Sequence, residues 1–434
     1  MSVRSTLLIS LVVLSVGDAS AELESGALGS SLTYGYGNAA SQSMQALLEL
    51  SPELEFSFGE NTALVASARI RLDAEDELEP GEPTLDTYAP ASRPLAISDI
   101  GTAELRDFYF ELRSRKGVTR LGKQQIVWGR LDGIKVLDLV NPQSFREFIM
   151  EDFGNSRVGL WSAYFDYNLA NWRTELALVV DGTGHEIPDT GAWFELSAPR
   201  FRFGSTTAQP SPPLATDTPR HSFDDAALGL RLSRTFGQVE VSGIAYTGID
   251  PEPLGRITSI DGVPGVERFF ERREAYGISA ETGLGTVILR AEYAYQPGRY
   301  FNQRVGNELS TINLDQHRGA IGLDVNAPFG FFLNIQYLLD SVNNAPTGLV
   351  RPETDRVATL YLRRSFMYDA LTFEARWYHS FGDDDDLAAV QIEYEFSGGT
   401  ALRLAVESFS GRGTGLFGQF ADRDRIVLGL EHTF

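Results

Sequence analysis

Charged side chains of both signs are concentrated between Arg120 and Trp161. Ionic groups that face one another across a narrow aqueous passage can select solutes by charge. The stretch therefore predicts a constriction, in which Arg130, Lys135 and Arg146 face Asp132, Asp138 and Glu147. The other interpretation is that these charges only stabilise the packing of the segment. The charged residues in or beside the stretch are Arg120, Lys123, Arg130, Asp132, Lys135, Asp138, Arg146, Glu147, Glu151, Asp152 and Arg157.

The same stretch interrupts a regular strand pattern. Residues 129–156 are expected to form a loop that leaves one strand near Gly129 and rejoins the next near Arg157. Asn141 followed by Pro142 is typical of a helix start, because Asn can cap the first turn and proline has a suitable fixed φ. Phe145, Phe148, Ile149 and Asp152 follow at helical spacing, so a short helix is expected there. Apolar residues beside charges suit a loop folded into the mouth of a barrel.

Most of the remaining chain alternates apolar and polar residues in segments of about ten, as strands with two different faces do. Leu48, Leu50 and Leu54 share one parity, for example, and Glu49 and Glu53 share the other. Tight turns alternate with long polar loops, the arrangement of a bacterial outer-membrane barrel. We therefore expect an all-β, transmembrane antiparallel β-barrel with short periplasmic turns and long extracellular loops.

The number of strands depends on a weak first segment. Eight hairpins, the closing strand at 426–434 and a weak strand at 32–36 give about eighteen strands. Without the weak strand, sixteen is expected, because single-chain bacterial barrels keep an even number. A soluble β-sandwich also has one apolar face per sheet. It is disfavoured because charges recur on the second face of most strands.

One parity of these strands is expected to face lipid and the other the lumen. Opposite charges share the second face at Arg173/Glu175, Arg290/Glu292, Glu374/Arg376 and Arg403/Glu407. They predict either a ladder of ion pairs or a lining that selects solutes, and the two are compatible. The candidate lumen-wall residues are Arg69, Arg71, Asp107, Glu111, Arg113, Arg173, Glu175, Arg290, Glu292, Glu374, Arg376, Arg403 and Glu407.

Composition indicates export and excludes several functions. Residues 1–21 have the pattern of a secretory signal: Arg4, an apolar core, and a small-residue site at Ala19–Ala21. Residues 22–434 are then the barrel. The chain has no cysteine and a net charge of −22, which exclude thiolate metal sites and disfavour nucleic acid. No cofactor is predicted.

Catalysis and metal binding are not expected. His379 and Ser380 are adjacent, so they lie on opposite faces of a strand and cannot form a nucleophile–base pair. The four aspartates at 383–386 could attract a hard cation. A solvated, self-repelling turn is the preferred interpretation, with divalent ions that bridge lipopolysaccharide as a further option.

The last strand places Ile426, Leu428, Leu430, His432 and Phe434 on one parity and ends on an aromatic residue. Phe434, Leu430 and Leu428 resemble the C-terminal signal that the barrel assembly machinery recognises in outer-membrane proteins. His432 stands where tyrosine is commoner. The resemblance implies insertion into the outer membrane of a Gram-negative bacterium, in contact with its lipid and lipopolysaccharide.

Short motifs of the charged stretch resemble a proteobacterial family of uncharacterised, porin-like outer-membrane β-barrel proteins. That family is often encoded beside RND-type transporters, which implies movement of small or lipid-like molecules. A channel for passive or loop-gated passage of small solutes is therefore the expected function. A conduit for hydrophobic molecules that works with an inner-membrane transporter, and a structural anchor, are the alternatives. The motifs are Leu121-Gly122-Lys123-Gln124, Trp128-Gly129-Arg130, Val136-Leu137-Asp138-Leu139-Val140-Asn141-Pro142 and Phe145-Arg146-Glu147.

Overall fold

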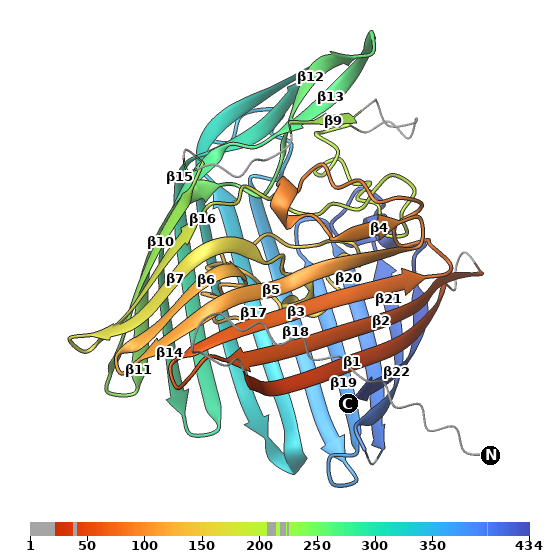
Figure 1. The fold of residues 1–434 in the computed structure, drawn as a ribbon. Coiled ribbons are helices and arrows are strands. Elements are labelled where there is room, and N and C mark those ends of the chain that lie inside the picture. The colour runs from red at the N-terminus through yellow and green to blue at the C-terminus, as the bar shows by residue number, and fades with distance from the viewer. Residues whose placement is uncertain (1–21, 38–40, 206–213, 218–222, 224, 397) are drawn as a thin grey trace.

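The computed structural model describes residues 22–37, 41–205, 214–217, 223, 225–396 and 398–434. The expected signal at 1–21 lies outside the described residues. Eighteen strands of the described part form a closed antiparallel barrel (Figure 1). Each strand pairs with the next along the chain, and β22 closes on β1 from Gly29↔Thr433 to Gly37↔Arg425. The expectation of eighteen strands is confirmed, and β1 is longer than the weak segment at 32–36.

The barrel strands have the length needed to cross a bilayer, and their lengths differ mainly at one rim. They are β1 (Glu22–Gly37), β2 (Gln42–Ser57), β3 (Thr62–Asp73), β5 (Gly101–Ser114), β6 (Gly117–Gln124), β7 (Leu160–Leu169), β8 (Trp172–Val179), β10 (Ala227–Phe236), β11 (Val239–Ile249), β14 (Arg272–Leu284), β15 (Val287–Val305), β16 (Glu308–Ala327), β17 (Phe331–Val342), β18 (Thr354–Phe366), β19 (Leu371–Ser380), β20 (Asp385–Phe396), β21 (Thr400–Ser410) and β22 (Arg425–Thr433).

One rim carries tight turns, and the other, called here the outer rim, carries the long loops. Above the outer rim, β9 (Leu214–Thr216), β12 (Leu254–Ile260) and β13 (Val263–Phe269) form a small separate sheet, at the top of Figure 1. A short β4 (Ala96–Ser98) pairs with β5. None of the helices in the described part of the chain has the length and apolar character of a membrane-spanning helix.

The alternation of side chains places the two parities as expected. Leu228, Leu230 and Leu232 on β10 are exposed on the outer face, and Arg231 between them is buried. The same contrast recurs on the other strands, with Ile335, Trp377 and Val390 among the exposed apolar residues. An apolar outer band and a charged interior are what a barrel in a bilayer requires.

The segment between β6 and β7 differs from the expectation in its bounds and its helix. Strand β6 ends at Gln124 and β7 begins at Leu160, so residues 125–159, called here the inserted segment, leave the barrel wall earlier than Gly129. The expected helix at 141–152 is wrong. The Asn141 side chain accepts a hydrogen bond from Ile126 N at 2.7 Å and donates one to Val158 O at 2.7 Å, so it ties the two ends of the segment together.

A left-handed residue explains why the helical spacing does not produce a helix. Phe148 has a φ of 53°, a conformation that right-handed helices do not contain. The one α-helical turn of the segment is α1 (Phe153–Ser156), after the expected helix. The phenylalanines at 145 and 148 point instead to different partners: His185 contacts the first ring, and Phe420 contacts the second.

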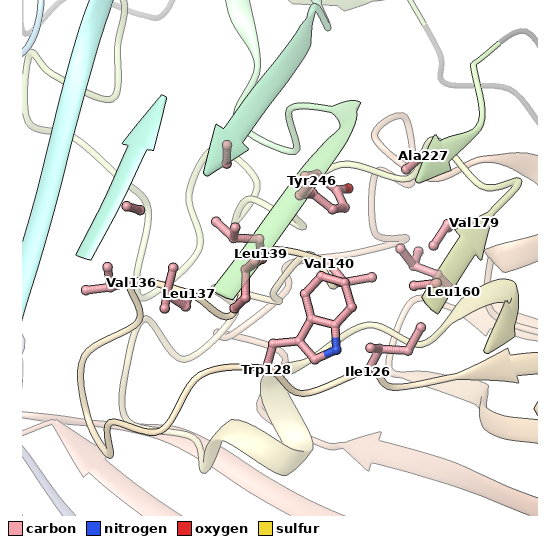
Figure 2. Packing of buried hydrophobic residues seen from close by; sticks show 14 of the residues in the cluster. Ile126, Trp128, Val136, Leu137, Leu139, Val140, Leu160, Val179, Ala227 and Tyr246 are labelled. Atoms are coloured by element: carbon pink, nitrogen blue, oxygen red, sulfur yellow. The ribbon is translucent and has the colours of Figure 1, made fainter. Parts of the chain in front are cut away.

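The inserted segment packs on the inner face of the barrel wall. Figure 2 shows Trp128, Leu139 and Val140 of the segment in one cluster with Tyr246 of β11. The wall offers small residues at these contacts, among them Ala177, Ala275, Ala294 and Ala320. A Cβ at Gly277 would lie 2.3 Å from Leu137 Cδ2, so glycine is required for this close approach. Burial of these apolar side chains favours the inserted position.

Candidate channel through the barrel

The charges at the start of the inserted segment bind to the barrel wall. The Arg130 guanidinium pairs with Glu240 of β11, and Asp132 lies 3.5 Å from Arg290 of β15. Glu292 of β15 accepts hydrogen bonds from the backbone N–H groups of Arg130 and Leu137. These contacts hold the start of the segment against β11 and β15.

Lys135, Asp138 and Arg157 form one cluster within the segment. Lys135 Nζ lies 3.3 Å from Asp138 Oδ2, and Arg157 Nε lies 2.8 Å from the same oxygen. The Lys135 ammonium also lies over the ring of Phe153, 4.5 Å from its centroid. Of the opposite charges expected to face each other across a constriction, Lys135 and Asp138 do pair, but inside the segment.

Arg146 and Glu147 both form ion pairs with residues outside the inserted segment. The Arg146 guanidinium is buried and lies 2.6 Å from Glu79, 2.8 Å from Glu186 and 3.4 Å from Glu104. Glu147 lies 3.1 Å from Arg425. Of the six residues expected at a constriction, only Lys135 and Asp138 pair with each other, and Arg130, Asp132, Arg146 and Glu147 pair with residues outside the segment. A constriction formed by these residues stays a prediction.

Arg120 and Lys123 belong to β6. In the described structure they line neither the large cavity inside the barrel nor the large cavity among its loops. Arg120 Nε lies 2.7 Å from Glu111 Oε2 on β5. Lys123 is buried and donates a hydrogen bond to the Ser92 carbonyl at 3.1 Å. Both residues hold the wall and the loop above it.

The lumen wall carries a ladder of ion pairs that runs mostly between strands. Arg173 with Glu175 and Glu374 with Arg376 pair within one strand, at 3.8 Å and 3.5 Å, as the sequence predicts. Arg290 instead pairs with Asp324, Glu281 and Asp132, and Arg403 with Glu431. The remaining wall contacts are Arg69 with Glu104 and Glu151, Arg71 with Glu49 and Glu147, Arg113 with Glu111 and Glu55, Arg231 with Glu175, Asp107 with Ser67, and Glu407 with Arg425.

An inner cavity of about 680 Å³ lies between the inserted segment and the opposite wall. Its wall comes from β17–β22 and from β1 and β2. Nine carboxylates and three arginines line it. The side chains of Asp132 and Asp152 are 77% and 78% exposed, and Glu393 has no hydrogen-bond or ion-pair partner in the described part of the chain. The carboxylates are Glu49, Asp132, Glu147, Glu151, Asp152, Glu374, Glu393, Glu407 and Glu431; the arginines are Arg376, Arg403 and Arg425.

An outer cavity of about 1020 Å³, called here the vestibule, lies among the loops of the outer rim. Its lining includes Phe201, Phe203, Leu254, Ile257 and Val266, together with six arginines and six carboxylates. The vestibule and the inner cavity have no lining residue in common. They are therefore two separate cavities, called here the two chambers.

A cluster of buried apolar residues, called here the aromatic cluster, separates the chambers. Ile149, Met150 and Tyr378, which pack against it, line the inner cavity, and Leu196 lines the vestibule. The ring of Phe420 lies 4.7 Å from Phe148 and 5.5 Å from Phe194. Four loops of the outer rim and three strands contribute to the cluster, which consists of Met44, Leu78, Phe148, Trp193, Phe194, Leu387, Phe409, Phe417 and Phe420.

Sequence reasoning missed this cluster, because its residues come from loops with no periodic pattern. The adjacent Trp193-Phe194 pair and the two phenylalanines at 417 and 420 are large apolar residues in otherwise polar loops. These large apolar residues could have indicated a buried cluster, since exposed loops seldom contain them without a packing partner.

The aspartates at 383–386 are neither a solvated turn nor a cation site in the described structure. Asp385 is fully buried and accepts hydrogen bonds from the backbone N–H groups of Phe417 and Gly418, both at 2.8 Å. Asp383 lies 2.7 Å from Arg200. No group of three or more histidines or acids in the described residues is arranged to hold a metal ion. The run instead fixes the loop that carries Phe417 and Phe420.

The closed antiparallel barrel of eighteen strands has the fold of the outer-membrane porins. Acinetobacter baumannii OccAB1 has the same fold at 9% identity, with a TM-score of 0.53 over 95% of this chain and 96% of that chain. Acinetobacter baumannii OccAB3 matches at 11% identity and a TM-score of 0.52, over 94% and 98%. Pseudomonas aeruginosa OccK2 (OpdF), solved in complex with glucuronate, matches at 10% and 0.52, over 94% and 97%.

The sequence itself identifies the family. Residues 48–312 match a family described as "Protein of unknown function (DUF1302)", and the chain belongs to it. No curated protein sequence matches the chain. The protein is thus an outer-membrane β-barrel of this family with a porin fold.

Proposed function

We propose that the protein is a loop-gated outer-membrane channel for small hydrophilic solutes, and that its lumen favours cations. The observation that supports this proposal best is the inner cavity, which is open to water beside the inserted segment. The inserted segment narrows the lumen, and the aromatic cluster closes the outer side of the cavity.

The preference for cations follows from which charges meet water. In the inner cavity, Asp132 and Asp152 are 77% and 78% exposed, whereas the three arginines are 28%, 31% and 3% exposed and each is paired with a carboxylate. Carboxylates lining an aqueous pore raise the local concentration of cations and lower that of anions. The ion pairs of the wall support the barrel but contribute little net field.

The charged inner cavity disfavours a conduit for uncharged hydrophobic molecules, because such molecules gain nothing by leaving lipid for a polar lumen. A protein that served only as a structural anchor would need neither the inner cavity nor the vestibule. A working partnership with an RND-type transporter, and assembly by the barrel assembly machinery through Leu428, Leu430 and Phe434, remain predictions.

Reversal potentials in planar bilayers test the charge preference. Under a KCl gradient, the purified protein should give a potential of the sign for K⁺ permeation. The variant Asp132→Asn, Asp152→Asn, Glu393→Gln should reduce the ratio of K⁺ to Cl⁻ permeability by about twofold or more. The matched control is Asp261→Asn, Asp369→Asn, Glu60→Gln, three exposed carboxylates of turns. A potential of the opposite sign, or equal loss in the control, contradicts the proposal.

A further inference from the structure

We propose that the vestibule is a binding site for an organic cation with an apolar body, which it holds above the acidic inner cavity. This inference rests on the proposed channel function and names a substrate class for it. The cavity volume of about 1020 Å³ is at the upper end of those that enclose small molecules, about 300–1,000 Å³.

The apolar part of the site comes from a loop and a hairpin that meet at the outer rim. Phe201 and Phe203 belong to the loop after β8, and Leu254, Ile257 and Val266 belong to the β12–β13 hairpin. Ile257 is 47% exposed although it is a large apolar residue. Aromatic rings beside open space bind both apolar groups and cations, since the ring face is electron-rich.

The charges of the vestibule are equal in number but unequal in exposure. The side chains of Arg200, Arg268, Arg299 and Arg351 are only 7–16% exposed, and each is paired with a carboxylate. Glu252, in contrast, is 63% exposed although it pairs with Arg299. A buried arginine paired with a carboxylate presents little charge to a ligand, whereas an exposed carboxylate does.

Three further charged residues of the vestibule are Glu82, Arg202 and Arg304. Glu82 lines the vestibule and is exposed. Arg304 has no carboxylate partner in the described residues, but it donates its Nε–H to the Phe203 carbonyl at 2.7 Å and lies beside Gly204 and Val350. Arg202 and Arg304 are both half-buried, whereas Glu82 and Glu252 are exposed, so carboxylates carry most of the charge that faces water in the vestibule.

The site is built before any ligand arrives. Asn302 of β15 accepts a hydrogen bond from Gly255 N at 2.9 Å and donates one to Gly255 O at 2.8 Å. These two bonds fix the β12–β13 hairpin to the tall β15–β16 hairpin, so the apolar wall has a fixed position. A ligand that enters such a site spends little of its binding energy on ordering the protein.

The inner cavity supports the same substrate class. Exposed carboxylates occur in both chambers: Glu82 and Glu252 above the aromatic cluster, and Asp132 and Asp152 below it. A cation gains electrostatic stabilisation on both sides, while an anion meets repulsion on both. An organic cation with an apolar body binds in the vestibule, whereas a simple inorganic cation passes through it.

Calorimetric titration of the folded, detergent-solubilised protein tests the inference, with heats for empty micelles subtracted. The probes are 2-naphthylmethylammonium, 2-naphthoate and tetramethylammonium. We expect the first to bind most tightly, because it alone combines an aromatic body with a primary ammonium group. The variant Glu82→Gln, Glu252→Gln should weaken its binding by about fivefold or more, and Ile257→Ser should weaken it as well.

The matched control is Glu267→Gln, Glu274→Gln, which removes two carboxylates outside the vestibule and should leave binding unchanged. Tighter binding of 2-naphthoate, equal binding of tetramethylammonium, or unchanged affinity in the Glu82/Glu252 variant overturns the inference. Binding is measured without conduction. A protein that binds the ammonium probe but shows no cation-selective current refutes the channel and not the site, and the reverse result refutes the site alone.

Discussion

Glu147 of the inserted segment and Arg425 of the last strand lie 3.1 Å apart, although 278 positions separate them in the chain. The same carboxylate lies 3.4 Å from Arg71 of β3. Arg71 belongs to the first strands and Arg425 to the last, which meet where β22 closes on β1. The segment is therefore fastened on one side by this ionic contact and on the other by apolar packing on the wall.

Removing the charge at this contact should loosen the segment. Glu147→Gln is expected to lower the free energy of unfolding by about 2 kcal/mol, because a hydrogen bond between charged groups is lost while Arg425 keeps Glu407. Urea unfolding of the folded barrel in detergent measures this change. Glu55→Gln is the control: its partner Arg113 is 44% exposed, so a change below about 0.5 kcal/mol is expected. Equal effects would show that Glu147 does not fasten the segment.

Because Leu137 lies so close to Gly277, a smaller residue at position 137 should partly rescue a destabilising substitution at Gly277. Gly277→Val should destabilise the protein by about 1–3 kcal/mol through overpacking. Leu137→Ala should restore part of that loss in the double variant, since it removes the colliding atoms. Gly243→Val is the matched control, because a Cβ at Gly243 meets nothing within 4 Å. Thermal unfolding measures all four proteins. If the losses of stability of the two single substitutions simply add in the double variant, Leu137 does not pack against Gly277 and the segment lies elsewhere.

The aromatic cluster should act as the barrier between the two chambers. Phe420→Ala is expected to raise the mean current per channel in planar bilayers, because Phe420 contacts Phe148, Phe194 and Phe409. Phe329→Ala serves as the control, since Phe329 lies at the tight-turn rim and is 85% exposed. A current unchanged by Phe420→Ala would show that solutes do not pass through the cluster.

His185 links the loop after β8 to the inserted segment and should make this contact sensitive to acid. Its Nδ1 accepts a hydrogen bond from Gln143 N at 2.9 Å. Burial, aided by the nearby cations Arg273, Lys135 and Arg299 and opposed by Asp250, lowers the pKa of His185 from 6.5 to about 3. Between these pH values the unfolded chain binds a proton that the folded protein excludes, so stability falls as the pH is lowered from 6.5 towards 3.

A titration of thermal stability against pH checks this effect. His185→Gln should lose less stability than the parent protein over that pH range, because glutamine keeps an acceptor and does not titrate. His317→Gln, an exposed histidine of β16, should follow the parent protein. Parallel curves for the parent protein and His185→Gln would show that other groups cause the loss.

The barrel could be predicted from the sequence because each strand is a local pattern. A shift of one residue would move Arg231 into lipid and Leu230 into the lumen, so the alternation alone determines the faces. The inserted segment was also recognised, since its mixed charges break that alternation. Its internal structure was not predicted, because Asn141 bonds to Ile126 and Val158 rather than capping a helix, which only the folded chain reveals.

The partners of the charged residues could not be predicted for the same reason. Arg146 has carboxylates within reach from three different parts of the chain, Glu79, Glu104 and Glu186. Spacing along the sequence carries no information on which of them will be close. The two chambers depend on such contacts between loops, so they appear only in the structure.

The role of the inserted segment is tested most directly by its removal. Single-channel conductance should be recorded in planar bilayers for the parent protein and for a variant that lacks residues 132–152. We predict a clearly larger unit conductance in the variant, because the narrowing of the lumen and Phe148 of the aromatic cluster are both lost. An unchanged conductance in the folded variant would contradict it and leave the segment as a support for the wall.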